Sequence, residues 1–220
     1  MIKSLKFNGK YIIMGLCLSV IVLISMYKST TLDFINESIM YLPLFAIIFS
    51  IFMNLELYEY RMEELYYVSN IYKWRTFLIR IINVIAIELI IIILNVLIYL
   101  ALFDLGFDYE SEIGIYFVTT INSFIYFTSV TTFVCGIIKR KSGSLCIMSL
   151  FWIYWIINVT NDSILNPFIF VAIPSNYEGT IMMQLIISCV LFILSFLIER
   201  RGPLWSEISL KRFFPRTKQG

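Results

Sequence analysis

The side chains best suited to chemistry lie in residues 56–80, ELYEYRMEELYYVSNIYKWRTFLIR, between two strongly apolar runs. The adjacent acids Glu63 and Glu64 would suit a metalloprotease only together with histidine ligands, and the chain has no histidine. The same absence excludes nucleophiles that need a histidine base, and no GxxxxGK(S/T) phosphate-binding loop occurs. The sequence therefore predicts a protein that is not an enzyme, has no catalytic or metal site, and binds no cofactor itself.

The elements that carry these residues must be membrane helices. The 220 residues are 60% hydrophobic with a mean hydropathy of +0.85, which is more apolar side chain than a soluble domain can bury. A helix needs about 20 apolar residues to cross about 30 Å of hydrocarbon. We expect one all-α membrane domain, residues 1–220, with six transmembrane helices at Tyr11–Tyr27, Ile39–Leu55, Phe77–Phe103, Ile113–Ile138, Leu145–Asn158 and Thr180–Ile198.

The distribution of positive charge predicts the orientation of these helices. Of the 17 Lys and Arg residues, 16 fall on one side of the expected helices, and only Lys28 falls on the other. Cytoplasmic loops retain Lys and Arg, so both termini are expected in the cytoplasm. The net charge of +2 gives no reason to expect nucleic acid as a partner. The bias toward Ile, Tyr, Asn and Lys favours a bacterial cytoplasmic membrane.

Residues 56–70, after the second expected span, have the pattern of an amphipathic helix. An apolar stripe runs beside an acidic stripe that contains Glu56, Glu59 and Glu63. One interpretation is an interfacial helix in the lipid head-group layer, although its acids would lie near anionic lipid. The other is a docking helix whose acidic face fits a cytoplasmic protein.

Residues 161–179, NDSILNPFIFVAIPSNYEG, contain about ten apolar residues between the fifth and sixth expected spans. A run of that length is too short to cross the bilayer. With Pro167 inside the run and Pro174 after it, we expect a re-entrant segment on the outer side. An ordinary apolar loop on the membrane surface is the alternative.

Two polar residues lie deep in the third expected span. Glu88 is about eleven residues into that span, where a carboxylate is costly unless it is neutral, paired or facing water. Asn95 follows at i+7 and therefore shares its face. The two residues predict a polar stripe that faces either a partner helix or a pathway. Because the chain shows neither internal repeats nor paired intramembrane charges, a helix interface is favoured for Glu88.

The arrangement of six spans, internal termini and a charged helix between spans two and three resembles the permease subunit of an ABC transporter of the ABC-2 type. In that family an acidic residue after the second span precedes an amphipathic helix, and a cation follows at the start of the third span. Here Glu56 or Glu59 would be the acid, residues 61–67 the helix, and Lys73, Arg75 or Arg80 the cation. The resemblance implies an ATPase-coupling site made of Glu56, Glu59, Arg61, Glu63, Glu64 and Tyr66.

The same resemblance implies the partners and the activity. The partners would be cytoplasmic ATP-binding cassette subunits that hold ATP and Mg²⁺, a second permease copy or a homologous permease, and membrane lipids. The expected activity is export of a small amphipathic substrate, either a peptide such as a bacteriocin or a lipid or drug. The alternative is a non-transporting membrane protein, an immunity or assembly factor, that binds a partner through the same cytoplasmic helix.

Overall fold

The computed structural model describes residues 31–59, 73–103, 110–169 and 177–201, together with Ile13 and Cys17. Within these residues the chain is all helical and contains no strand, which confirms the predicted all-α class. The helices are α2 (Thr31–Tyr41), α3 (Pro43–Glu59), α5 (Lys73–Phe103), α6 (Glu110–Ile138), α7 (Lys141–Ile157) and α9 (Tyr177–Arg201).

Four helical stretches are long and apolar enough to cross a membrane: Phe34–Leu55, Lys73–Ala101, Gly114–Ile138 and Glu178–Arg200. They correspond to the second, third, fourth and sixth expected spans, and they support a membrane-embedded protein. Helix α7 covers the fifth expected span with 17 residues, at the short end of the spanning range. The first expected span, Tyr11–Tyr27, lies outside the described residues except for Ile13 and Cys17.

The second span is broken at Pro43, a feature that the sequence analysis did not anticipate. Helix α2 ends at Tyr41, Leu42 forms a turn, and α3 begins with Pro43 at its first position. Proline has no N–H to donate to the carbonyl four residues earlier, so the helical hydrogen bonding cannot run through this point. Near the break, the Met40 carbonyl accepts a hydrogen bond from the Trp152 indole of α7, at 2.9 Å.

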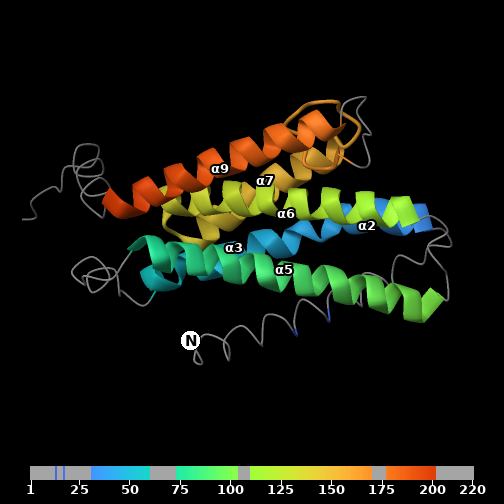
Figure 1. Cartoon of the computed structure of the whole chain (residues 1–220). Helices are drawn as coiled ribbons and strands as arrows, with labels where there is room; N and C mark the ends of the chain where they lie inside the picture. The colour runs from blue at the N-terminus through green and yellow to red at the C-terminus, as the bar shows by residue number, and fades with distance from the viewer. Residues whose placement is uncertain are drawn as a thin grey trace, which may run out of the picture.

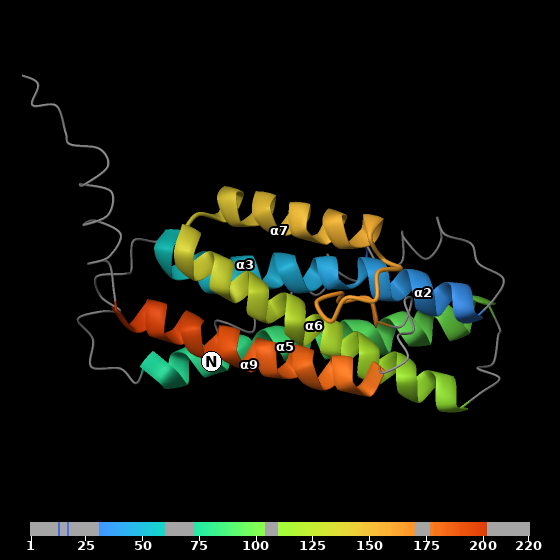
Figure 2. The same cartoon turned by 90° about the horizontal axis from the view of Figure 1, so that it is seen from above.

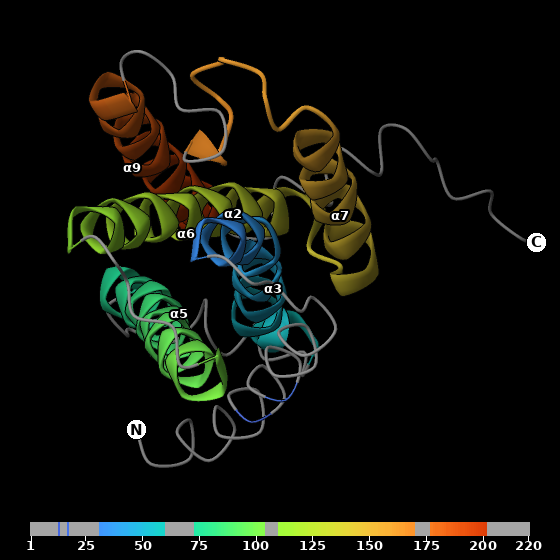
Figure 3. The ribbon, with the colours of Figure 1, turned by 90° about the vertical axis from the view of Figure 1, so that its right-hand side faces the viewer.

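Helix α6 is the centre of the bundle. It packs against α2, α3, α5, α7 and α9, whereas α3 also contacts α5 and α7 (Figures 1 and 2). Seen end-on, α3 and α6 lie in the middle and α5, α7 and α9 surround them (Figure 3). Of the most apolar stretch in each span, 78% is buried in α2–α3 but only 17% in α9. Helix α9 is therefore a peripheral helix whose outer surface would face lipid.

All the described cations lie at one end of the bundle, which we call the basic end. Helices α3, α6 and α9 finish there, and α5 and α7 begin there (Figure 1). The cations are Lys73, Arg75, Arg80, Lys139, Arg140, Lys141, Arg200 and Arg201. Within the described ranges, the opposite end carries acids such as Asp162 and Glu178 but no Lys or Arg.

A tight turn joins α6 to α7 at the basic end. Lys139 has φ +53°, a left-handed conformation that side chains other than glycine adopt rarely. Its backbone N–H closes α6 by donating to the Cys135 carbonyl at 3.0 Å. Two residues later α7 begins, so the backbone of Gly143 comes close to Ile138. A Cβ placed on Gly143 would lie 2.9 Å from Cγ2 of Ile138.

This crowding predicts opposite effects for two glycine substitutions. Gly143→Ala should lower the stability of the protein by about 1 kcal/mol, because the cost of overpacking exceeds the gain in helix propensity. Gly114→Ala is the matched control, because a Cβ on Gly114 in α6 meets nothing within 4 Å. That variant should be as stable as the parent or more stable by up to about 1 kcal/mol. Thermal unfolding midpoints in detergent measure both, and an equal or higher midpoint for Gly143→Ala would contradict the tight turn.

Candidate functional site

The polar interior of the bundle is built around α6. Eight polar residues of this helix are buried: Thr119, Thr120, Asn122, Ser123, Thr128, Ser129, Thr131 and Thr132. They occupy several faces of the helix, so most of its surface needs protein neighbours, although Ile115, Val118 and Ile137 are exposed. Other helices cover most of α6, and four of these residues bond neighbouring elements: Asn122, Ser123, Thr128 and Thr132.

Glu88 lies between α5 and α6 with only 1% of its surface exposed. The Thr128 hydroxyl of α6 donates to its Oε1 atom at 3.1 Å. Among the described residues, Oε2 has no hydrogen-bond partner. The structure thus places this predicted residue at a helix interface, where it holds one hydrogen bond across α5 and α6.

Asn95 lies on the same buried face of α5, closer to the end opposite the basic end. The Tyr41 hydroxyl of α2 donates to its Oδ1 atom at 3.1 Å. A neighbouring bond runs from the Ser38 hydroxyl of α2 to the Tyr116 hydroxyl of α6, at 3.2 Å. The two predicted intramembrane residues therefore share a stripe, but they bind different helices.

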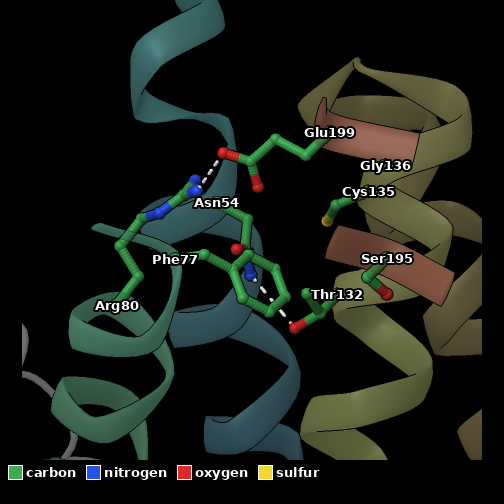
Figure 4. A pocket seen from close by; sticks show the side chains of 8 residues that line it. All are labelled: Asn54, Phe77, Arg80, Thr132, Cys135, Gly136, Ser195 and Glu199. Atoms are coloured by element: carbon green, nitrogen blue, oxygen red, sulfur yellow. Dashed lines mark hydrogen bonds and ion pairs between the residues drawn. The ribbon is translucent and has the colours of Figure 1, made fainter. Parts of the chain in front are cut away.

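A small pocket lies among the basic ends of α3, α5, α6 and α9 (Figure 4). Its volume is about 10 Å³, and its lining consists of Asn54, Phe77, Arg80, Thr132, Cys135, Gly136, Ser195 and Glu199. Asn54 of α3 donates to the Thr132 hydroxyl of α6 at 3.2 Å. Across the pocket, the Arg80 guanidinium of α5 forms an ion pair with the Glu199 carboxylate of α9. The pocket is thus a junction where four helices are tied by polar contacts.

Aromatic rings surround the ion pair on the α5 side. The Trp74 ring meets Phe196 of α9 edge-on, with centroids 4.6 Å apart. The Phe77 ring lies 5.6 Å from Phe196, and the Arg80 guanidinium carbon lies 5.9 Å from the centre of the Phe77 ring. Side chains of both partners are only 12% and 13% exposed, so water screens the Arg80–Glu199 attraction weakly.

A second cluster holds the chain that follows α7. Residues 166–169 are buried, although 166–168 are not part of a regular helix. The Asn166 side chain shapes this loop: its amide donates to the Val159 and Asn161 carbonyls, each at 2.8 Å, and its oxygen accepts the Phe168 N–H at 3.0 Å. Phe168 then packs against Phe127 of α6, with ring centroids 5.9 Å apart.

Gln184 of α9 connects this loop to the bundle. Its amide donates to the Ile164 carbonyl at 3.0 Å and to the Asn166 carbonyl at 2.6 Å. Its oxygen accepts a hydrogen bond from Asn122 of α6 at 2.6 Å. The Ser123 hydroxyl of α6 bonds the Pro167 carbonyl. Loop carbonyls that would otherwise be unpaired inside the bundle are therefore satisfied by side chains of α6 and α9.

The predicted coupling residues fall at the edge of the described chain. Glu56 and Glu59 lie in the last turns of α3 at the basic end. The remaining predicted residues, Arg61, Glu63, Glu64 and Tyr66, lie outside the described residues, as does Pro174. Pro167 is buried in the loop against α6.

Sequence reasoning missed several of the contacts that tie the interior together. Arg80 was named as a candidate cation at the start of the third span, but its partner Glu199 was not expected. Asn122 and Gln184 were not singled out, although an amide side chain within an apolar run is itself a signal. Their partners could not be inferred from the sequence. Asn122 and Gln184 are 62 residues apart and bond each other across two helices, and Gln184 also bonds carbonyls of a loop.

No protein-family model matches this chain, and no curated protein or solved structure matches it either. Any assignment of function therefore depends on the chain's own residues.

The Gln184 cluster predicts a selective loss of stability. Gln184→Leu should destabilise the protein by at least about 1–3 kcal/mol, because it leaves two loop carbonyls and the Asn122 amide without partners. Met183→Leu is the matched control, since Met183 is the preceding residue of α9 and is 46% exposed. Thermal unfolding in detergent should show a clear drop for the first variant and none for the second. Equal midpoints for both variants would contradict the described hydrogen bonds.

Proposed function

We propose that this chain is the permease subunit of an ATP-driven exporter of the ABC-2 type in a bacterial cytoplasmic membrane. The observation that carries the proposal is the position of the acidic segment, residues 56–70. Helix α3 ends at Glu59 and α5 begins at Lys73, both at the basic end of the bundle. Because cytoplasmic ends retain Lys and Arg, residues 56–72 connect two spanning helices on the cytoplasmic side. An ATPase bound to this segment could act directly on α3 and α5.

In this proposal the chain carries out no chemistry itself. ATP and Mg²⁺ are held by the cytoplasmic partner subunits, which convert nucleotide binding and hydrolysis into movement of the segment. A second permease, either another copy or a homologue, completes the transporter within the lipid bilayer. The substrate class is small and amphipathic, such as an antimicrobial peptide, a lipid or a drug.

We propose further that the loop after α7 is a re-entrant segment on the outer side. Gln184 lies six residues into the spanning stretch that starts at Glu178, a depth of about 9 Å along α9. Ser123 lies nine residues into the stretch that starts at Gly114, about 14 Å along α6. Irregular backbone is tolerated at membrane depth only where protein groups satisfy it. The hydrogen bonds from Gln184 and Ser123 to the loop carbonyls support this reading.

The proposed orientation can be tested with two exposed positions. Ser142 lies at the basic end and Asp162 at the opposite end, and both are exposed. An impermeant thiol reagent applied to intact cells should label Asp162→Cys but not Ser142→Cys, which should react only after permeabilisation. Labelling of Ser142→Cys in intact cells would reverse the assignment of the cytoplasmic side.

The coupling role of the acidic segment can be tested by reversing its charge. Glu59→Lys with Glu63→Lys should abolish copurification of the ATPase, because buried interfacial charge pairs are worth about 2–5 kcal/mol and reversal adds repulsion. Asp162→Lys with Glu178→Lys is the matched control, with the same change of net charge on exposed residues at the opposite end. The control should keep the ATPase.

Three outcomes separate the possible roles of the segment. Loss of the ATPase only in the Glu59/Glu63 variant supports the proposal. Retention of the ATPase together with transport would contradict it. A stable protein that never copurifies with a nucleotide-binding partner, even without substitutions, would favour the non-transporting immunity or assembly factor.

A further inference from the structure

Helix α9 touches both polar junctions of the bundle. Glu199, near its basic end, pairs with Arg80 of α5. Gln184, near its other end, holds the loop carbonyls of Ile164 and Asn166. The two side chains are 15 residues apart, a distance of about 22 Å along a helix. Between Thr180 and Arg201 the helix contains neither proline nor glycine, so it has no residue that commonly causes a kink.

The junction at the basic end connects α9 to the segment proposed to bind the ATPase. Residues 56–72 lead directly into α5, and the α5 side chains that meet α9 are Trp74, Phe77 and Arg80. These contacts begin one residue after α5 starts and extend over two turns. Toward the opposite end, α5 and α9 separate (Figure 1). The start of α5 is thus in contact with the basic end of α9, and the rest of α9 lies away from α5.

The pocket beside the ion pair is small, with about the space of one water molecule. It is bordered by Asn54, from the last turns of α3, as well as by Arg80 and Glu199 (Figure 4). The Nε atom of Arg80 is buried and has no hydrogen-bond partner among the described residues. An incompletely bonded guanidinium next to a cavity is held less firmly than one with every donor satisfied.

We propose that α9 is a rigid link between the two junctions, so that release of the Arg80–Glu199 pair at the basic end loosens the loop of residues 163–169 at the other end. The pair acts as a clamp: while it holds, the basic end of α9 stays against α5, and Gln184 keeps the residues from Asn166 to Ile169 buried. When the start of α5 is displaced, α9 shifts and the carbonyls held by Gln184 are released. This deepens the proposed function, because it assigns the route from the ATPase segment to the outer loop.

Thiol labelling in native membranes without added nucleotide tests the link. The reporter is Ile169→Cys, since Ile169 is 2% exposed in the loop and should react slowly with an aqueous thiol reagent. Ile164→Cys, at a position 48% exposed, sets the fast rate. Met148→Cys, at a fully buried position on α7, reports whether the bundle as a whole has loosened.

Glu199→Gln removes the charge of the clamp with little change in shape. It should raise the labelling rate of the Ile169→Cys reporter at least about fivefold, the lower end of usual coupling between two sites. The Met148→Cys reporter should remain slow. Replacing both partners, as Arg80→Met with Glu199→Leu, should restore slow labelling, because apolar packing can substitute for a buried ion pair.

An unchanged Ile169→Cys rate in Glu199→Gln, alongside a raised rate in Gln184→Leu, would overturn the link through α9. Equal acceleration of the Ile169→Cys and Met148→Cys reporters would overturn it as well, because the effect would then be general loosening. Fast labelling in the double apolar variant would show that contact between α5 and α9 does not hold the loop. None of these readouts requires an ATPase. The labelling results can therefore support the link through α9 even if no ATPase copurifies, and an ATPase can copurify even if the labelling results contradict the link.

Discussion

The structure depends on keeping the polar surface of α6 away from lipid. A helix with eight buried polar residues cannot lie at the edge of a membrane bundle, since hydrocarbon offers no hydrogen-bond partners. The other helices pack around it, and α5, α7 and α9 carry most of the apolar residues exposed on the outside of the bundle. Glu88 of α5, Asn54 of α3 and Gln184 of α9 all bond residues of α6. The peripheral helices can then be almost entirely apolar on their outer faces, as α9 is.

Two junctions complete this arrangement, one near each end of the bundle. At the basic end, the Arg80–Glu199 pair and its aromatic surroundings join α5 to α9. At the other end, Gln184 and Ser123 satisfy the carbonyls of a loop that is buried between α6 and α9. A helix that joins both is well placed to carry movement across the membrane. The proposed permease would need such a route, because the proposed ATPase segment and the loop after α7 lie at opposite ends of the bundle.

Much of the helical framework could be predicted from the sequence. Long apolar runs are a strong signal, because few other structures satisfy the backbone in lipid, and α5, α6 and α9 begin and end near the expected residues. Glu88 and Asn95 were expected on one inward face, and both are buried there. The break at Pro43 was missed, because a proline at the first position of a helix is compatible with a continuous apolar run.

The polar junctions were harder to predict than the helices. The Arg80–Glu199 pair joins residues 119 positions apart, and spacing along the chain carries no information about that contact. Gln184 stabilises backbone carbonyls, whose positions depend on the fold and not on residue type. The acidic residues Glu59 and Glu63 are easy to recognise in the sequence, in contrast to the polar junctions. The role proposed for them, however, depends on a partner outside the chain.

The proposed ATP-binding partner is tested most directly by native mass spectrometry of the tagged chain extracted from its own membranes. We expect a complex with two membrane subunits, each of 25.8 kDa where both are this chain, together with ATPase subunits that carry bound nucleotide. Peptide sequencing of those partners should find a phosphate-binding loop. A chain recovered alone, or only with proteins that bind no nucleotide, would contradict the account.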